Sequence, residues 1–366
     1  MKFTINQSDL YQAINIVQKA VSRKETLPIL SGIYLETNKN KGLHLMANNL
    51  ELGIEYWIDA EVEDECAIVL PANNLISLVR ELPSENIVFN IDMDSFQAGI
   101  KCLESEFIIK GFDPEEFPSL PSLETSNFMK INGKILKSMI EKVKFSISNN
   151  QTQPALTGTL FEINKESMAL VATNTYRLAC YKVKNKTNLE NKHSFIIPGE
   201  TISNLNSLLT GDEDLEMIFN KNYAKFKFND IILISRLIEG QFPNYEQVIP
   251  DKYNTSIIAD KIKLNNSAKR ASLIANVVNL NIVDESLIIE STESESGHAH
   301  EKVDIKIDGP EQNINIDANY LLDVIKVMDE EEINIKLIDS INPLAVKIKN
   351  GNEDYTYLIM PVRPNS

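Results

Sequence analysis

Apolar residues recur with the period of an α-helix in three segments that lie far apart in the chain. In each segment they stand at positions i, i+4, i+7 and i+11, which places them on one face of a helix. The three sets are Leu10, Ile14, Val17 and Val21; Leu136, Ile140, Val143 and Ile147; and Leu264, Ala268, Ala271 and Ala275. A short strand-like run precedes each set (KFTI, FMKI and TSIIA). The pattern therefore predicts three similar strand–helix pairs.

A second helical pattern, with spacing i, i+3 and i+7, follows in each third of the chain. It begins after Pro71, Pro198 or Asp317, and a Pro or an Asp suits a helix N-terminus. Its apolar positions are Leu75, Leu78 and Leu82; Ile202, Leu205 and Leu209; and Leu321, Val324 and Met328. Each of these predicted helices ends in an acidic turn (PSEN, GDED and DEEE).

Strand-like text fills the intervals between the helices. Residues 42–58 and 167–183 are parallel texts, with Ala47 matching Ala172, and residues 285–296 are a weaker third copy. Each third then closes on β-rich sequence, at 107–112, 231–238 and 355–362. The alternation of apolar and polar residues in AKFKFNDIILISRL is typical of antiparallel strands. We therefore predict an α+β protein of three tandem domains, each with two helices packed on antiparallel sheets, at 1–124, 125–250 and 251–366.

Two similar phrases lie where one copy gives way to the next. They contain Phe117-Pro118 and Phe242-Pro243, with acidic residues nearby. Proline favours extended backbone in the residue before it, and acidic residues favour solvent. We expect both segments to be extended, exposed linkers.

The composition indicates a globular protein without membrane or secretory signals. The chain has 366 residues, of which 43 % are hydrophobic. No apolar run approaches the roughly 20 residues of a membrane span, and the first residues lack the apolar core of a signal peptide. Cys66, Cys102 and Cys180 form neither a disulfide framework nor a zinc motif. We expect a cytoplasmic protein.

The net charge of −16 argues against nucleic acid, but the first helix of each copy is locally basic. A total charge does not say where the positive groups lie. These groups are Lys19, Arg23 and Lys24; Lys134, Lys137, Lys142 and Lys144; and Lys261, Lys263, Lys269 and Arg270. A positive face on an equivalent helix of each copy favours a phosphate backbone that is held without base readout.

Three similar domains in a row form an arc with a free sheet edge at each end. Two such arcs joined head to tail would pair both edges and close a ring of six domains. In the third copy, Leu273 falls on the side of the first helix that is opposite its apolar face when the residues are placed on a helical wheel, and Ile274 falls beside that face. An apolar residue at such a place indicates either a subunit contact or a scattered surface leucine.

The sequence contains no recognisable catalytic constellation. It has no GxxxxGK[ST], no GxGxxG after a strand, no HExxH and no GxSxG. His298 and His300 in GHAH could bind a metal, but no carboxylate or Cys follows at ligand spacing, so we expect a polar loop and no metal site.

Three classes of protein stay open at this point. They are a non-enzymatic ring that encloses DNA, a tandem-domain enzyme acting on nucleic acid or carbohydrate, and a monomeric scaffold that binds peptides. Metal-dependent turnover of DNA would favour the enzyme. Charge reversal at Lys137 and Lys144 would leave the scaffold's function intact.

Five stretches of sequence, in this order and on a threefold repeat, carry a specific resemblance. They are MKFTI at the start, TLPILSGIYLE at 26–36, LVATNTYRLA at 170–179, LIEGQFPNYEQVIP at 237–250 and YLIMPVR near the end. Over its whole length the chain resembles the bacterial sliding clamp, the beta subunit of DNA polymerase III. The resemblance implies a head-to-tail homodimer that surrounds double-stranded DNA without sequence preference. It implies no catalytic activity and no cofactor, because such a clamp tethers a polymerase to its template and makes synthesis processive.

The resemblance also implies a set of protein partners and one pocket for them between the second and third domains. The partners are the alpha subunit of DNA polymerase III, the delta subunit of the clamp loader, other polymerases, ligase and mismatch-repair proteins. Each presents a short segment with a Gln and spaced Leu and Phe side chains. The matched pocket positions are Leu156, Thr173, Tyr176, Arg177, Leu178, Pro243, Val248, Tyr320, Leu358, Met360, Pro361, Val362 and Arg363.

For DNA, the residues expected to face the duplex combine family matches with the basic pattern. They are Arg23, Lys24, Asn73, Lys137, Lys144 and Asn150. Family members often carry basic residues where this chain has Asn73, Gly199 and Glu200, which predicts weaker contacts there. Leu273 and Ile274 match the family's subunit interface. The tail from Pro364 to Ser366 runs past the family's usual end and could alter the rim of the pocket.

Overall fold

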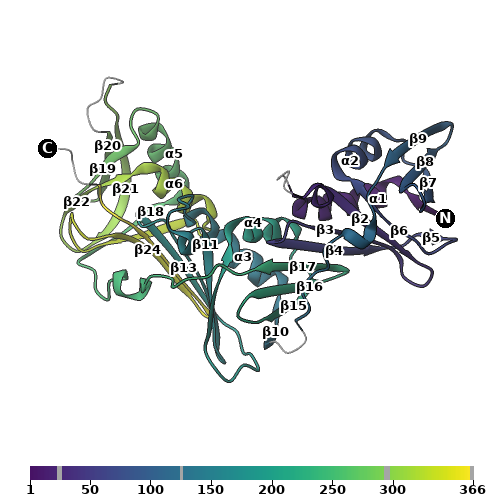
Figure 1. The fold of residues 1–366 in the computed structure, drawn as a ribbon. Coiled ribbons are helices and arrows are strands. Elements are labelled where there is room, and N and C mark those ends of the chain that lie inside the picture. The colour runs from purple at the N-terminus through teal and green to yellow at the C-terminus, as the bar shows by residue number, and fades with distance from the viewer. Residues whose placement is uncertain (23–26, 124–126, 292–296, 363–366) are drawn as a thin grey trace. The chain divides into compact units, whose positions relative to one another are not determined.

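The computed structural model describes residues 1–22, 27–123, 127–291 and 297–362. The chain forms two compact units, one of residues 1–134 with 207–237 and the other of residues 135–206 with 238–366. Helices and antiparallel sheets make up both units (Figure 1). None of the helices in the described ranges is long and apolar enough to cross a membrane.

The three predicted first helices are present. They are α1 (Gln7–Val17), α3 (Gly133–Val143) and α5 (Lys261–Ser272), and they directly follow strands β1 (Lys2–Asn6), β10 (Asn127–Asn132) and β18 (Thr255–Asp260). Side-chain oxygens of Asn6 and Asp260 accept hydrogen bonds from backbone N–H groups in the first turns of α1 and α5, at 3.0 and 2.8 Å, which explains where these helices begin. The helices are shorter than predicted, because Val21, Ile147 and Ala275 lie beyond their ends.

The three predicted second helices are also present, as α2 (Ala72–Glu81), α4 (Gly199–Leu208) and α6 (Ala318–Val327). Asp317 caps α6 by accepting a hydrogen bond from the backbone N–H of Asn319 at 2.9 Å. Leu82, Leu209 and Met328, the last apolar positions of the pattern, come one residue after each helix and are buried. The apolar period therefore predicted burial correctly at positions where the helix has already ended.

The first unit contains two antiparallel sheets. One has the strand order β5-β1-β7-β8-β9, which leaves β9 at an edge, and the other has the order β10-β15-β16-β17-β4-β3-β2-β6. The strands not yet given are β2 (Gly32–Asn38), β3 (Gly42–Asn48), β4 (Leu52–Ile58), β5 (Glu61–Val62), β6 (Ala67–Pro71), β7 (Asn86–Asp92), β8 (Gln97–Cys102), β9 (Ser105–Lys110), β15 (Asp214–Phe219), β16 (Tyr223–Phe228) and β17 (Ile231–Arg236).

The second unit contains one continuous run of twelve paired strands. Their order is β14-β11-β12-β13-β25-β24-β23-β18-β21-β20-β19-β22, and every pair is antiparallel. The strands not yet given are β11 (Gly158–Ile163), β12 (Ser167–Thr173), β13 (Arg177–Lys184), β14 (His193–Pro198), β19 (Val277–Val283), β20 (Ser286–Ser291), β21 (His300–Asp308), β22 (Gln312–Asp317), β23 (Glu332–Leu337), β24 (Leu344–Asn350) and β25 (Glu353–Ile359).

Successive copies of the repeat are joined through equivalent strands. β4 of the first copy pairs with β17 of the second, with Ile54 opposite Leu233. β13 of the second copy pairs with β25 of the third, with Ala179 opposite Tyr357. Because 42–58 and 167–183 are parallel texts, β4 and β13 hold the same place in their copies. The compact units follow these joined sheets rather than the repeat, so the predicted domain borders at 124/125 and 250/251 stay predictions.

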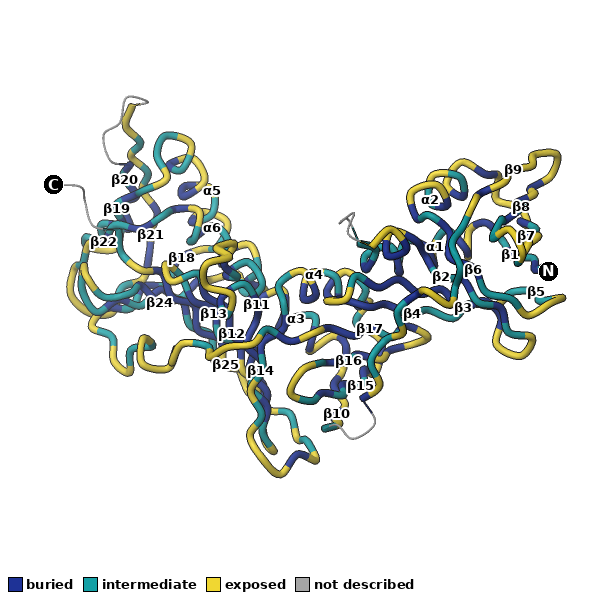
Figure 2. Tube along the Cα trace, viewed as in Figure 1, coloured by how far each residue is buried: buried dark blue, intermediate teal, exposed yellow. Residues whose placement is uncertain are grey.

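The apolar face of each first helix lies in the core. Leu10, Ile14 and Val17 are fully buried, and α1 packs against α2, β3 and β4. In the second unit Leu264 and Ala268 are fully buried, and α5 packs against α6, β20 and β21. Figure 2 shows the buried residues concentrated along the strands and on the inner sides of the helices. These helices are therefore held by tertiary burial of one face.

The two Phe-Pro linkers are less exposed than predicted. Phe117 is buried against a cluster that includes Met46 and Val69, and Phe242 packs against a core cluster of the second unit. Short 3-10 turns, Pro114–Glu116 and Tyr245–Val248, interrupt the extended backbone. The prediction of exposed linkers is therefore wrong for the Phe117 and Phe242 rings, because burying an aromatic ring is favourable, while Glu115, Glu116 and Pro243 are nearer to the prediction and are exposed.

Candidate functional site

The start of β13 and the end of β25 bring several predicted pocket residues together. Leu178 lies directly opposite Leu358 in the strand pairing, and Arg177 lies opposite Ile359. One residue further on, the backbone N–H of Met360 donates to the carbonyl of Tyr176 at 2.8 Å. Leu178 and Leu358 are buried, so the exposed part of this region is formed by the residues at the strand ends.

A tight turn between β12 and β13 positions Tyr176. The Asn174 side-chain oxygen accepts the backbone N–H groups of Tyr176 and Arg177 at 3.1 and 3.0 Å. The Thr173 hydroxyl donates to the Arg177 carbonyl at 2.7 Å and accepts from the Thr175 N–H at 3.1 Å. These bonds hold Thr175 at a φ of +76°, a backbone region that L-residues rarely adopt. The turn therefore presents the Tyr176 ring in a defined place.

Arg177 supports this region from inside rather than offering a free cation. Its guanidinium donates to the Asp323 carboxylate of α6 and to the Phe145 carbonyl. It also lies 4.5 Å from the ring centre of Tyr320 and 5.4 Å from that of Phe145. The side chain is almost fully buried. Because a planar guanidinium can pair and stack at once, Arg177 fixes the position of Tyr320 on α6.

The second linker forms the neighbouring part of the region. Phe242, Tyr245 and Ile249 pack against the core cluster that contains Leu178 and Leu358. Pro243 and Val248, between and beside these anchors, are exposed. Leu156 is buried, and its neighbour Ala155 packs on the same cluster. The linker is thus held at Phe242, Tyr245 and Ile249, three or four residues apart, which leaves its predicted pocket residues Pro243 and Val248 accessible.

We call the exposed part of this region the strand-end surface, defined by Tyr176, Val248, Tyr320, Met360, Pro361 and Val362. Tyr176, Val248 and Met360 expose 64 %, 45 % and 37 % of their surface. The backbone N–H of Val362 donates to the Asn315 carbonyl at 2.8 Å, so the chain after β25 is held against β22. Arg363, the remaining predicted pocket residue, lies outside the described residues, as does the tail from Pro364.

The equivalent place at the join between the first and second copies has a different chemistry. There Arg236 donates its backbone N–H to the Glu51 carbonyl at 2.8 Å, which matches the bond between Met360 and Tyr176. The Glu51 and Arg236 side chains form an ion pair at 3.6 Å. The two joins share a backbone geometry, but the first join carries a charged pair, Glu51 and Arg236, at the positions where the second join carries the exposed apolar side chains of Tyr176 and Met360. An apolar ligand is therefore favoured at the second join.

We expect Tyr245→Phe to destabilise the second unit at neutral pH. The Tyr245 hydroxyl donates to Glu162 of β11 at 2.6 Å, and Lys192 pairs with the same carboxylate at 2.7 Å. Burial alone would raise the pKa of Glu162, but these two hydrogen bonds together with the charges of Lys192 and Lys182 hold that pKa below its ordinary value. Removing the hydroxyl costs about 1.5–3 kcal/mol, as for a hydrogen bond to a charged group. Thermal unfolding at pH 7 measures this loss.

The pH dependence of that loss follows from the direction of the Glu162 pKa shift. Because the pKa of Glu162 is lower in the folded than in the unfolded protein, the ionised carboxylate stabilises the fold at pH values above its unfolded-state pKa. This stabilisation is lost as the pH falls through the folded-state pKa. The difference between the parent and Tyr245→Phe should therefore shrink in acid. Tyr223→Phe on β16 serves as the control for loss of a tyrosine hydroxyl. Equal melting temperatures of the parent and Tyr245→Phe at pH 7 would contradict this role.

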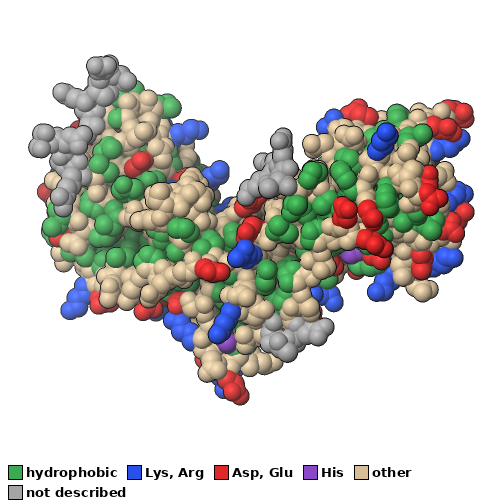
Figure 3. Space-filling view, viewed as in Figure 1, with side chains coloured by type: hydrophobic (Ala, Val, Ile, Leu, Met, Phe, Trp, Pro, Cys, Tyr) green, Lys and Arg blue, Asp and Glu red, His purple; other side chains and the backbone are tan. Residues whose placement is uncertain are grey.

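The structure describes four of the six residues that were predicted to face DNA. Asn73 is exposed in the first turn of α2, Asn150 is exposed after α3, and Lys137 and Lys144 are partly exposed on α3 and the turn after it. Arg23 and Lys24 lie outside the described residues. On the face shown in Figure 3, Lys and Arg side chains are scattered among Asp and Glu side chains.

Some basic residues of the predicted helix faces form ion pairs within the protein. Lys142 is buried, pairs with Asp329 at 3.0 Å and lies 5.1 Å from the ring centre of Tyr181. In the third copy, Arg270 pairs with Glu301 at 2.5 Å. The expectation that such residues are free to meet phosphate is wrong for Lys142, because a helical period does not show which neighbouring element covers a long side chain.

The predicted subunit-contact residues lie at the C-terminal end of α5. Leu273 caps the helix and exposes 76 % of its surface, and Ile274 is partly buried. Sequence reasoning missed a second exposed apolar pair, Phe107 and Ile108 on the edge strand β9. The sequence contains the signal, because residues 107–112 match 231–238 and 355–362, but only the sheet order shows that, among the described strands, β9 pairs with β8 alone.

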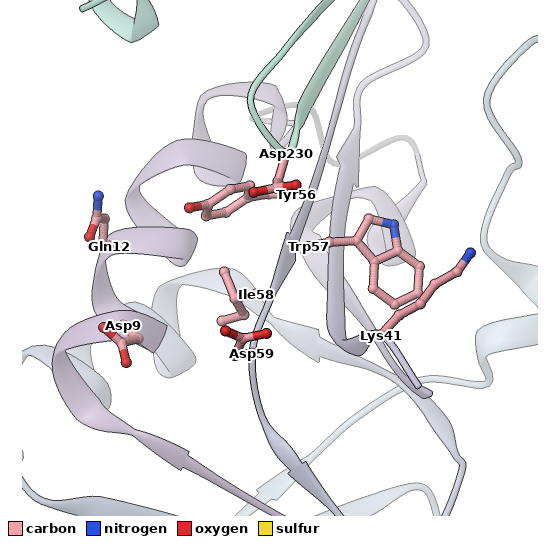
Figure 4. A pocket seen from close by; sticks show the side chains of 8 residues that line it. All are labelled: Asp9, Gln12, Lys41, Tyr56, Trp57, Ile58, Asp59 and Asp230. Atoms are coloured by element: carbon pink, nitrogen blue, oxygen red, sulfur yellow. The ribbon is translucent and has the colours of Figure 1, made fainter. Parts of the chain in front are cut away.

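A polar cavity of about 360 Å³ in the first unit lies apart from the predicted residues. Asp9 and Gln12 of α1, Tyr56 of β4 and Asp230 line it (Figure 4). Burial, and then the charges of Asp230 and Asp9, raise the pKa of Tyr56. With several carboxylates in its wall, this cavity does not suit a phosphate group.

The fold and the strand-end surface together define a class of protein. It consists of tandem α+β domains joined edge to edge, with an exposed apolar surface at one join, and its sequence carries no recognised catalytic motif. Models of the DNA polymerase III beta subunit match the chain over three ranges: the N-terminal domain at 1–121, the central domain at 130–244 and the C-terminal domain at 246–363. The chain belongs to this family, the sliding clamps, and its function is that of a non-catalytic processivity factor.

Individual relatives agree over the full length. The chain is 30 % identical to proteins named Beta sliding clamp from Staphylococcus aureus and Staphylococcus epidermidis, with 99 % of each chain covered. It superposes on the DNA polymerase sliding clamp of Bacillus subtilis with a TM-score of 0.94, at 29 % identity and full coverage of both chains. A Pseudomonas aeruginosa sliding clamp bound to griselimycin gives a TM-score of 0.93 at 25 % identity, again with full coverage.

Proposed function

We propose that this protein works in the cytoplasm as a head-to-tail homodimer whose six domains encircle duplex DNA. The supporting observation is the exposure of Phe107 and Ile108. Phe112 bridges Val69 as Ile238 bridges Ile196, so the equivalents of the exposed pair in the second copy are Leu233 and Ile234. The matching backbone bonds of Arg236 and Met360 make Tyr357 and Leu358 the equivalents in the third copy, and all four residues are buried. The buried residues lie in β17 and β25, which pair with a neighbouring copy. The exposed pair lies in β9, which pairs with β8 and ends the sheet.

The strand expected to cover β9 follows from the same equivalence. The chain contains two such joins. In each, the last strand of one copy (β17 or β25) pairs with a strand of the preceding copy (β4 or β13, respectively). The third copy holds β21 at that place. Among the described strands, residues 300–304 of β21 pair with β20 alone. A third join of the same kind would therefore form between β21 of one protomer and β9 of another. Because α5 packs against β21, Leu273 and Ile274 at the end of α5 would lie near this contact.

The strand-end surface is the proposed site for partner peptides. Tyr176 and Met360 offer an aromatic face and a flexible thioether, which suits one surface to several ligands. The polymerase alpha subunit, the clamp-loader delta subunit, other polymerases, ligase and mismatch-repair proteins are the proposed partners. They would dock a Gln and spaced Leu and Phe side chains, and the exposed linker residues Pro243 and Val248 form one wall.

Charge reversal of Lys137 and Lys144 to Glu should weaken retention on DNA. If both side chains contact phosphates, each lost contact reduces the slope of log affinity against log salt by about 0.9. The measurement is the affinity for a nonspecific duplex over a series of salt concentrations. Lys225→Glu with Lys227→Glu makes the same charge change on β16 and serves as the control. An unchanged salt slope for the Lys137 and Lys144 variant would contradict the assignment of these residues.

Negative-stain electron microscopy of the purified protein tests the ring itself. Closed particles with about six lobes and an open centre are the expected result. Three-lobed arcs at micromolar concentration would contradict a ring that is stable without DNA. This test depends on neither the peptide site nor the basic residues, so it addresses the oligomeric architecture alone.

A further inference from the structure

Three side chains with metal-binding atoms gather on the β20–β21 hairpin of the second unit. They are Glu290 of β20, His300 at the start of β21, and His298 two residues before it. One ligand atom from each lies within 4.8 Å of the other two. Glu290 and His300 are direct partners in the strand pairing, and His300 Nδ1 lies 2.8 Å from a Glu290 oxygen. In the sequence His298 stands eight positions after Glu290, and the hairpin brings the two side chains together.

The backbone holds these side chains in place. The Ser291 N–H donates to the Ala299 carbonyl at 3.0 Å, and the Ala299 N–H donates to the Ser291 hydroxyl at 2.7 Å. His298 Nδ1 lies 3.1 Å from the Ser291 carbonyl, to which it can only donate. That bond assigns the proton to Nδ1 and leaves the Nε2 lone pair of His298 available. A histidine held by its other nitrogen in this way is the usual arrangement of a metal ligand.

The face of the hairpin that carries the cluster is separate from the charged groups of α5. Successive residues of a strand point to opposite faces, so Glu301 points away from His300. On that opposite face, Arg270 of α5 neutralises Glu301 at 2.5 Å. Glu290 and His300 are partly exposed, so a hydrated ion can reach them without any opening of the structure.

We propose that Glu290, His298 and His300 form a binding site for a divalent transition-metal ion, with Zn²⁺ as the best-fitting ion. Two imidazole nitrogens and one carboxylate oxygen suit Zn²⁺, whereas Mg²⁺ and Ca²⁺ prefer oxygen ligands alone. Three protein ligands leave a fourth position for water. In a zinc site the Zn–N and Zn–O bonds are about 2.0–2.2 Å long, so the three ligand atoms would draw closer to a common centre on binding. The prediction of no metal site from sequence had considered only residues that follow the histidines.

The bound ion would link the end of β20 to the start of β21, and affinity is the direct test. Untagged full-length protein is titrated with ZnCl₂ in competition with a chromophoric chelator. His298→Ala and His300→Ala should each weaken zinc binding at least about tenfold. Glu290→Gln should also weaken it while keeping the shape of the side chain. Zinc should raise the melting temperature of the parent protein and not that of the His298→Ala, His300→Ala double variant.

Two controls separate this site from other ligands in the chain. His193→Ala removes a histidine from β14, at the opposite end of the twelve-strand order, and should leave zinc affinity unchanged. Blocking accessible thiols before the titration excludes binding by Cys66, which is partly exposed. If the double variant binds zinc within twofold of the parent, Glu290 and His300 are an ordinary ion pair and the proposal is overturned. Zinc affinity by itself decides neither ring formation nor DNA retention; because His300 begins β21, the strand that the proposed ring pairs with β9, the oligomeric state of each histidine variant is measured alongside.

Discussion

Replacing Ile108 with Asp should convert the dimer to a monomer at micromolar concentration. Ile108 exposes 72 % of its surface on the edge strand β9, and the equivalent Ile234 and Leu358 are buried at the joins within the chain. The proposed contact therefore buries an isoleucine that is exposed in the single chain. An aspartate at that position would place an unpaired charge in an apolar contact.

The expected size of the effect follows from the symmetry of a two-subunit ring. Burying an isoleucine side chain contributes about 2 kcal/mol, and a head-to-tail dimer contains the contact twice. A loss of about 4 kcal/mol corresponds to a rise in the dimer dissociation constant of roughly a thousandfold. The desolvation of the introduced charge adds to this loss. Sedimentation velocity across a concentration series measures the dissociation constant directly.

Ile341→Asp is the matched control for this experiment. Ile341 exposes 78 % of its surface, as much as Ile108, but lies between β23 and β24 rather than on the edge strand. It should leave the dimer intact. Leu273→Asp on the other side of the contact should act in the same direction as Ile108→Asp. A fully dimeric Ile108→Asp protein would show that β9 is not the subunit contact, whatever the electron micrographs display.

The second large effect is expected at the strand-end surface. Tyr176→Ala combined with Met360→Ala should weaken binding of a peptide that carries a Gln and spaced Leu and Phe residues. Truncating a central anchor of a binding surface typically costs about 2 kcal/mol, which corresponds to roughly a thirtyfold loss of affinity. Both side chains are exposed in the single chain, so their removal should leave the melting temperature close to that of the parent. Fluorescence anisotropy with a labelled peptide measures the affinity.

The chain contains its own control for this variant. Glu51 and Arg236 hold the equivalent positions at the first join, with the same backbone hydrogen bond. Glu51→Ala with Arg236→Ala should therefore leave peptide affinity unchanged. Arg177→Ala should reduce affinity by a different route, because it releases Tyr320 and Asp323 of α6 and lowers stability as well. Equal affinity for the parent and the Tyr176, Met360 double variant would place the peptide site elsewhere.

The repeat made most of the fold predictable from sequence. Two helical faces and their preceding strands recur three times, and a pattern that recurs is much harder to misread than a single one. The turns repeat as well, since Leu50 and Thr175 hold matching places and both have positive φ, at 72° and 76°. The apolar period could not predict the residue at which each first helix ends. An apolar residue one turn further, such as Val21, fits the spacing equally well whether or not the backbone is still helical.

Long side chains and linkers were the places where pattern reasoning failed. Lys142 looked like part of a basic helix face, but Asp329 and the Tyr181 ring cover it. Phe117 looked like part of an exposed connection, but its ring is buried. In both cases the outcome depends on an element that is remote in sequence. Local period carries no information about which remote element will come to lie beside a side chain.

The amino-acid sequence by itself determined the repeated domain, its helices and strands, and the family, because these rest on local period and on text that recurs along the chain. Only the tertiary structure decided which surfaces are open. It left Phe107 and Ile108 on an edge strand and exposed Tyr176 and Met360 at one join, whereas the equivalent positions at the other join hold the ion pair of Glu51 and Arg236. It also brought Glu290 to His298 and His300. Exposure and proximity depend on which strands pair, and strand pairing joins residues whose separation in sequence no local pattern encodes.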